Sequence, residues 1–162
     1  MKYIKLYEQN KPIIQLDYSV KNLTELPKLP DSLEMLYCGY NKLTELPELP
    51  KSLKILDCYN NKLTKLPKLP NTLEQLYCNN NNLTKLPKLP NSLKYLYCYY
   101  NNLTQLPKLP NSLKYLDCKN NNLPYNNLDE YKEYINKHKD LIEEYGYDKA
   151  MNILSNINKF NL

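Results

Sequence analysis

Residues 41–60 read NKLTELPELPKSLKILDCYN, and this stretch matters most because it recurs without insertion. Five such units run from residue 21 to residue 120. Each fits the template N-x-L-T-x-L-P-x-L-P-x-[ST]-L-x-x-L-x-C-x-x, except that the first unit begins with lysine. We number them units 1 to 5, starting at residues 21, 41, 61, 81 and 101. A fixed 20-residue period is typical of a solenoid in which each repeat forms one coil.

The second half of each unit predicts a short β-strand. In unit 1, Leu36 and Cys38 alternate with Met35 and Tyr37, which is the two-residue period of a strand. One strand of this length cannot bury its apolar side alone, but stacked copies can do so as a parallel sheet. The alternation places leucine and cysteine inward and the residues between them outward.

The first half of each unit predicts an extended return path. In unit 1, Leu23, Leu26 and Leu29 recur at every third residue, interspersed with Pro27 and Pro30. A polyproline-II segment has three residues per turn, so these leucines fall on one side of it. Because proline lacks the N–H that a helix interior or a central strand needs, we expect neither element here.

Together the two halves resemble a leucine-rich repeat. Leu53–Leu63 is similar to the signature LxxLxCxxNxL, and Leu86–Leu93 is similar to the LPxLPxSL stretch of the short 20-residue class. That class is typical of bacterial type III secreted effectors, and the composition rich in Asn, Lys and Tyr also resembles repeat proteins of giant DNA viruses. The resemblance implies a right-handed curved solenoid with parallel strands on its concave face. It also implies a protein-binding scaffold, directed at a host protein if a pathogen or virus encodes it.

Catalysis is not expected from this sequence. Several effectors of the class carry a large C-terminal ubiquitin-ligase domain with a catalytic cysteine. Here 39 residues follow Leu123, and no cysteine follows Cys118. The single histidine, His138, has no nucleophile–base arrangement around it in the sequence. Two isolated glycines cannot build a phosphate-binding loop. We therefore expect a non-enzymatic protein with no cofactor and no metal.

The chain divides into three parts by its patterns. Residues 1–20 form an N-terminal cap with a degenerate repeat, residues 21–123 contain the five units and a partial sixth, and residues 124–162 form a C-terminal cap. Residues 3–7 alternate like a strand, and we expect them to form a β-hairpin or an extra edge strand with residues 13–18. No apolar run reaches the roughly 20 residues of a membrane span, and no secretory signal is visible at the start.

The C-terminal cap is predicted to be a helical hairpin. Asn127 followed by Glu130 matches a capping box, and apolar residues then recur at helical spacing. Gly146 is suited to follow the end of this first helix. A second helix is predicted from about Asp148, with its apolar side against the last coil.

Two columns of residues are predicted to be structural. An asparagine where each strand ends can bond backbone groups of its own turn and of the next coil, and leaving such buried groups unpaired costs roughly 1–3 kcal/mol each. A cysteine at each inward strand position suits a leucine core, and no Cys-x-x-Cys or His pair suggests a metal. Side chains in a parallel ladder lie alongside each other, so we expect free thiols and a reducing compartment, the cytoplasm or a host cytoplasm. The columns are Asn41, Asn61, Asn81, Asn101 and Asn121, and Cys38, Cys58, Cys78, Cys98 and Cys118.

The outward strand positions and the two residues after them are rich in tyrosine. Tyrosine is enriched in binding hot spots, because it offers contact area at low entropic cost. The predicted partner-binding residues on the concave face are Tyr37, Asp57, Tyr77, Tyr95, Tyr97, Tyr99, Tyr100, Tyr115 and Asp117. The opposing interpretation is that A+T-rich coding supplies tyrosine and that ring stacking only stabilises the sheet. The sequence leaves both open.

Lysine offers a different interpretation of the surface. Lysines lie in four L-P-x-L-P segments and begin three strands: Lys28, Lys68, Lys88 and Lys108, and Lys54, Lys94 and Lys114. With tyrosine they could hold single-stranded nucleic acid or another polyanion by charge and stacking. The absence of arginine and a net charge of only +5 favour a solvated face instead. A structural solenoid without a dedicated partner is the remaining alternative.

Overall fold

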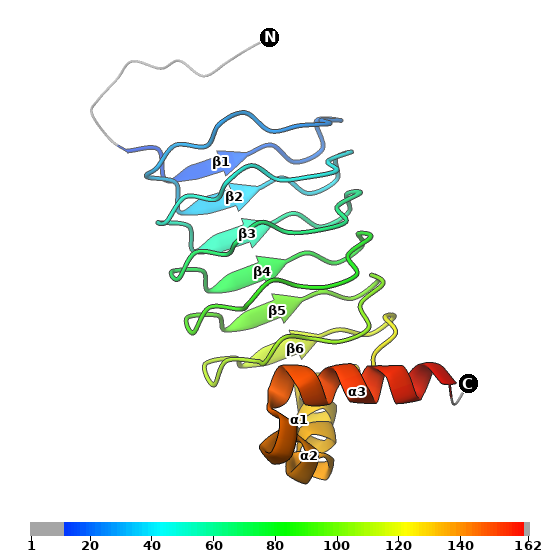
Figure 1. Cartoon of the computed structure of the whole chain (residues 1–162). Coiled ribbons are helices and arrows are strands. Elements are labelled where there is room, and N and C mark those ends of the chain that lie inside the picture. The colour runs from blue at the N-terminus through cyan, green and yellow to red at the C-terminus, as the bar shows by residue number, and fades with distance from the viewer. Residues whose placement is uncertain (1–11, 161–162) are drawn as a thin grey trace.

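The computed structural model describes residues 12–160. It shows a solenoid whose coils stack along one axis, with a group of helices below the last coil (Figure 1). This confirms the predicted fold class. The strand expected over residues 3–7 lies outside the described residues.

A parallel sheet runs along one side of the solenoid. Its six strands follow each other in sequence order, and each has three residues. They are β1 (Gln15–Asp17), β2 (Met35–Tyr37), β3 (Ile55–Asp57), β4 (Gln75–Tyr77), β5 (Tyr95–Tyr97) and β6 (Tyr115–Asp117). The register places the central leucines in one line, with Leu16 beside Leu36 and Leu96 beside Leu116. The expected edge strand within residues 13–18 is therefore β1, in parallel with β2.

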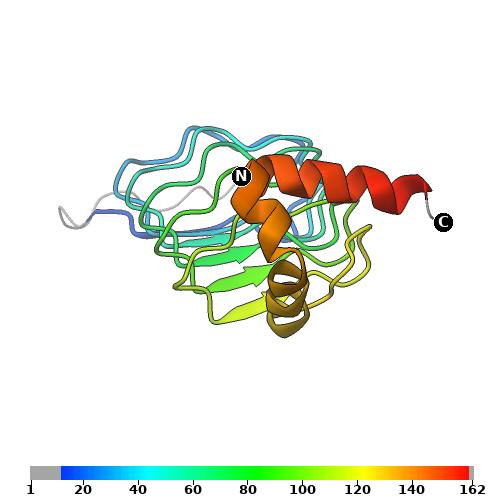
Figure 2. The same cartoon turned by 60° about the horizontal axis from the view of Figure 1, so that its bottom comes forward.

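The return segments lie on the other side of the coils, as Figure 2 shows. They contain no helix or strand in units 1 to 5. In unit 4, Leu83, Leu86 and Leu89 are buried, while Thr84, Lys85 and Lys88 are exposed. These leucines pack with those of the strands into one continuous core between the sheet and the return segments.

The C-terminal cap has three helices, α1 (Leu128–Lys137), α2 (Lys139–Tyr145) and α3 (Tyr147–Phe160). Asn127 is the N-cap of α1, because its Oδ1 accepts hydrogen bonds from the N–H groups of Asp129 and Glu130. The predicted capping-box partner Glu130 reaches back, but it accepts from the N–H of Asn126 and from the side-chain amide of Asn127. The prediction of one helix up to Gly146 was wrong. The helical path breaks at His138, where φ is −110° and ψ is 23°, and Nδ1 of this residue lies 2.8 Å from the carbonyl oxygen of Tyr134.

Gly146 separates α2 from α3 with φ 77° and ψ 157°, a region that only glycine reaches readily. Two tyrosines then attach the cap to the last coils. The Tyr147 hydroxyl donates to the carbonyl of Leu106 at 3.0 Å, and the Tyr131 hydroxyl donates to that of Tyr147 at 3.1 Å. Tyr131 of α1 belongs to the core of the coils, whereas Ala150, Met151 and Leu154 of α3 form a second cluster.

Candidate functional site

The asparagine column forms a ladder of side-chain hydrogen bonds through the interior. Asn81 is typical: its Oδ1 accepts from the N–H of Leu63 at 2.9 Å. Its amide donates to the carbonyls of Cys58 at 3.1 Å and Cys78 at 3.2 Å. The same bonds link the preceding unit to Asn41, Asn61, Asn101 and Asn121. Each asparagine thus joins two consecutive coils.

The cysteine column lies just before this ladder. All five thiols, of Cys38, Cys58, Cys78, Cys98 and Cys118, are free and buried. Burial raises the pKa of Cys78 to about 12, and it raises the pKa of Cys58 and of Cys98 well above the ordinary value. A thiol that stays protonated is a poor nucleophile and a poor metal ligand. No group of three His, Cys, Asp or Glu side chains in residues 12–157 is placed to hold a metal ion.

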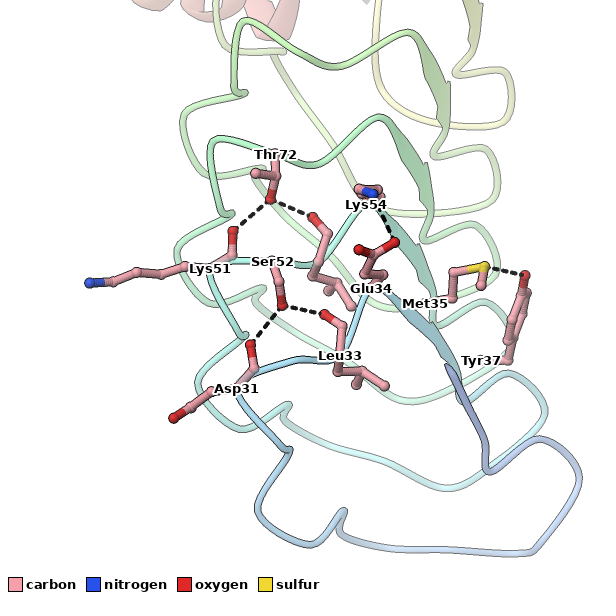
Figure 3. A network of polar contacts seen from close by, with 10 residues as sticks. Asp31, Leu33, Glu34, Met35, Tyr37, Lys51, Ser52, Lys54 and Thr72 are labelled. Carbon is pink, nitrogen blue, oxygen red and sulfur yellow. Dashed lines mark hydrogen bonds and ion pairs between the residues drawn. The ribbon is translucent and has the colours of Figure 1, made fainter. Parts of the chain in front are cut away.

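A third column, of hydroxyl groups, was not identified from the sequence. Figure 3 shows the Ser52 hydroxyl donating to the carbonyls of Asp31 and Leu33, both at 2.7 Å, and Thr72 repeating this contact one unit later. Ser92 and Ser112 bond the carbonyls of Leu73 and Leu93 in the same way. The signal was the [ST] position of the template, which accepts only residues with a hydroxyl on Cβ.

We call the side of the sheet directed away from the leucine core its outer face, which is the side predicted to be concave. Tyrosines on this outer face form a row of contacting rings. The ring of Tyr97 lies between those of Tyr77 and Tyr115, with both centroid distances 4.9 Å. The Tyr77 and Tyr97 rings are nearly parallel, with 13° between their planes. Tyr95 lies beside Tyr115 in the register of β5 and β6. The row therefore spans β4 to β6 and belongs to the C-terminal half of the solenoid.

The remaining predicted tyrosines are divided between the two halves. Tyr37 is half-buried on β2, and its hydroxyl faces the sulfur of Met35 (Figure 3). Tyr99 and Tyr100 follow β5, with ring centroids 5.8 Å apart, and Lys119 Nζ lies 5.4 Å from the Tyr99 centroid. Tyr100 is 55% exposed and Tyr115 44%, whereas Tyr77, Tyr95, Tyr97 and Tyr99 are half-buried by their neighbours.

Tyr100 occupies a strained backbone position. The last residue of each unit has φ between 51° and 55°, a left-handed conformation that asparagine tolerates and a bulky residue seldom adopts. Asn60, Asn80 and Asn120 hold this position in three units, in line with the tolerance of asparagine for a positive φ. Tyr40 and Tyr100 hold it in the other two, and both are exposed.

The two aspartates of the outer face lie in different electrostatic surroundings. Asp57 is flanked by Tyr37 and Tyr77 in the sheet register. Burial raises its pKa to about 6, Asp17 adds to that effect, and the N–H of Tyr59 opposes it. Asp117 lies in the same position on β6 and forms an ion pair with Lys119 at 3.4 Å.

The lysines are divided between the sheet side and the return side of the solenoid. At the strand starts, Lys54 pairs with Glu34 and Lys94 pairs with Glu74, both at 2.7 Å. The lysines of the L-P-x-L-P segments lie on the return side, and the leucine core separates them from the outer face of the sheet. The two sets of lysines therefore lie on different sides of the coils, and the nucleic-acid interpretation stays a prediction.

The repeat template, the parallel sheet and the asparagine ladder agree with comparisons to known proteins. The family model described as "Leucine Rich repeats (2 copies)" matches residues 31–71 and 51–91. These are leucine-rich repeats. No curated protein matches the sequence.

Solved structures of bacterial effector proteins resemble the solenoid. YopM from Yersinia enterocolitica WA-314 has 45% identity over 62% of this chain and 22% of its own, with a TM-score of 0.61. A Shigella effector leucine-rich repeat domain has 43% identity over 67% of this chain and 50% of its own, with a TM-score of 0.65. YopM from Yersinia pestis has 38% identity over 62% and 35%, with a TM-score of 0.54. The chain spans half or less of each relative.

Proposed function

We propose that this leucine-rich repeat protein is a non-enzymatic scaffold that binds a protein partner on the outer face of its sheet. The observation that carries the proposal is the row of contacting rings formed by Tyr77, Tyr97 and Tyr115. The core template does not demand these residues, since the same positions hold Met35, Ile55 and Asp57 in other units. The row is a local feature of β4 to β6.

Ring contacts hold the tyrosine side chains of this surface in place before a partner binds. Tyr97 is held between two neighbours, so its side chain loses little further freedom when a partner arrives. Tyr115 and Tyr100 present large exposed ring faces beside it. Rigid aromatic groups with a polar end are favoured at the centre of protein interfaces.

The resemblance to bacterial effectors supports a host protein as the partner. By the same argument the site of action is the host cytoplasm, whose reducing conditions suit five free buried thiols. No helix in the described part of the chain is long and apolar enough to cross a membrane. The alternative of a solenoid without a dedicated partner explains the ring row by sheet stabilisation alone.

The test compares tyrosines inside and outside the row. A triple variant of the row, Tyr77→Ser, Tyr97→Ser and Tyr115→Ser, is used beside wild type in affinity purification from host-cell lysate, with proteins identified by mass spectrometry. We expect proteins enriched on wild type to fall at least about tenfold on the triple variant, because a hot spot contributes at least ~2 kcal/mol.

The matched control replaces exposed tyrosines away from the row, Tyr40→Ser and Tyr145→Ser. It should retain the enriched proteins. Urea unfolding of each variant establishes that the solenoid is intact. Equal retention by a folded triple variant would contradict the proposal and favour the structural alternative.

A further inference from the structure

The return side of the solenoid changes charge along its axis. In units 3 to 5, the two positions flanking the first Leu-Pro pair of L-P-x-L-P hold five exposed lysines, the half-buried Gln105 and no acid. In units 1 and 2 the same positions hold Glu25, Lys28, Glu45 and Glu48. We call the five residues the lysine cluster: Lys65, Lys68, Lys85, Lys88 and Lys108. Because the template accepts either sign here, the fold does not require this cluster.

The lysine cluster is not neutralised within the described residues. None of its ammonium groups forms an ion pair or hydrogen bond there. This differs from the sheet side, where Lys54 and Lys94 each pair with a glutamate of the preceding unit. Adjacent coils are about 4.8 Å apart, so lysines in equivalent positions repel each other. An anionic partner would relieve that repulsion.

Two grooves built from equivalent positions differ in charge. The groove between units 1 and 2 has about 790 Å³ and is lined by Lys28, Lys51, Asp31 and Glu48, which balance. The groove between units 4 and 5 has about 830 Å³ and is lined by Lys88 and Lys108, by Asn91 and Asn111 in place of the charged pair, and by Asp148 of α3. The second groove thus has a similar volume and a net positive charge, whereas the charges of the first groove balance.

We propose that the groove between units 4 and 5, with the lysine cluster beside it, binds a short acidic segment of a protein partner. Lysine contributes point charges without the bidentate geometry of arginine, which suits flexible carboxylates. The prolines on both sides of Lys68, Lys88 and Lys108 fix the backbone that carries them. The tyrosine row faces the opposite side, so this surface is separate from the first.

The flanks of the cluster favour a short segment over a long polyanion. The two lysine positions are three residues apart, about 9 Å along a polyproline-II path, and the cluster covers two coil steps, about 10 Å. A nucleic-acid backbone or an anionic membrane would extend beyond it. It would then meet Glu25, Glu45 and Glu48 at one end and the acid-rich helical cap at the other. A short run of Asp or Glu side chains in the groove meets only one of these acids, Asp148, beside Lys88 and Lys108.

The test measures binding of a fluorescent peptide of six glutamates flanked by Gly-Ser, by anisotropy in ~50 mM and ~200 mM salt, against the equivalent glutamine peptide. Wild type should bind the glutamate peptide, and more weakly at the higher salt concentration. The variant Lys88→Glu/Lys108→Glu should weaken binding at least about tenfold. A further variant adds Asp31→Asn and Glu48→Lys to Lys88→Glu/Lys108→Glu, which makes the groove between units 1 and 2 positive. This variant should recover part of the binding.

The matched control, Lys42→Glu/Lys114→Glu, makes the same charge change at exposed lysines outside the cluster. It should keep most of the affinity. The proposal is overturned if the glutamate peptide does not bind wild type in ~50 mM salt. It is also overturned if the control loses as much affinity as the groove variant, or if a 20-base-pair DNA duplex binds more tightly than the peptide with the same sensitivity to Lys88 and Lys108.

Discussion

The residue type at a given template position is nearly constant in the inner columns of the solenoid and variable on its outer faces. Inside, cysteine is the same in all five units and asparagine begins every unit but the first, and the asparagine side chains bond backbone groups of neighbouring coils, as Asn101 shows with Cys78 and Cys98. Outside, one residue away, the position of Tyr97 holds Tyr37 in unit 1 and Asp57 in unit 2. Stability is therefore spread evenly along the axis. The side chains that we propose for recognition are concentrated in units 3 to 5.

Removing one asparagine of the inner ladder should have the largest effect on stability. Asn81→Ala leaves the buried N–H of Leu63 without its side-chain acceptor, while the carbonyl of Cys58 keeps a hydrogen bond from the Asn61 amide. We expect a loss of about 1–3 kcal/mol in the free energy of unfolding, which is the cost of one unpaired buried group. Urea unfolding followed by circular dichroism measures it.

The control is the next residue in the chain. Asn82 is exposed, and Asn82→Ala keeps its backbone bond from N–H to the carbonyl of Leu63. It should change stability by no more than about 0.5 kcal/mol. If both variants lost the same amount, the division between inner columns and outer faces would fail.

The repeated interior was predictable because its physics is local and periodic. A leucine, a cysteine and an asparagine at fixed spacing specify an inward strand side and a turn, and the structure places Leu36, Cys38 and Asn41 accordingly. The hydroxyl column has the same periodicity, but its bonds reach the preceding coil. The partner of Ser52 therefore emerges only once the coils are stacked.

The cap and the ring row were less predictable, because contacts outside the repeat decide them. The apolar spacing from Leu128 to Tyr145 is helical throughout and gives no sign of the break at His138. Tyrosine alternation predicts an outward row, but not that Tyr97 stacks flat on Tyr77 and is half-buried by it. Side-chain packing between strands determines these details.

A single carboxylate on the outer face should make stability depend on pH. The pKa of Asp57 is about 6 when folded, above the ordinary value of 3.8, so the folded state binds the proton more tightly. Its favourable contribution is complete below pH ~3.8 and is lost as pH rises through about 6. Asp57→Asn should therefore be more stable than wild type at pH 7, by about 1 kcal/mol once screening of this half-buried group is allowed for.

The measurement is the difference in unfolding free energy between variant and wild type from pH 4 to pH 8. Asparagine keeps an oxygen for the N–H of Tyr59, which lies 3.4 Å from Asp57 Oδ1. Asp117→Asn is the matched control on β6. It removes an ion pair with Lys119 and should give no gain at pH 7. A difference for Asp57→Asn that does not change with pH would show that this carboxylate ionises as it does in the unfolded chain.

The smallest expected effect concerns the strained tyrosine at the end of unit 4. Tyr100 has φ 51° where Asn60 and Asn80 have 55° and 53°, so Tyr100→Asn should raise the free energy of unfolding by about 0.5 kcal/mol. Tyr99→Asn, next to it, removes the contact with Lys119 without relieving strain and should destabilise. Urea unfolding compares the two.

If Tyr100→Asn gains stability but weakens retention of the enriched partner, the outer face keeps this residue for binding, as expected where function and stability conflict. If it loses stability, the ring contact with Tyr99 outweighs the strain, and Tyr100 belongs with the structural residues.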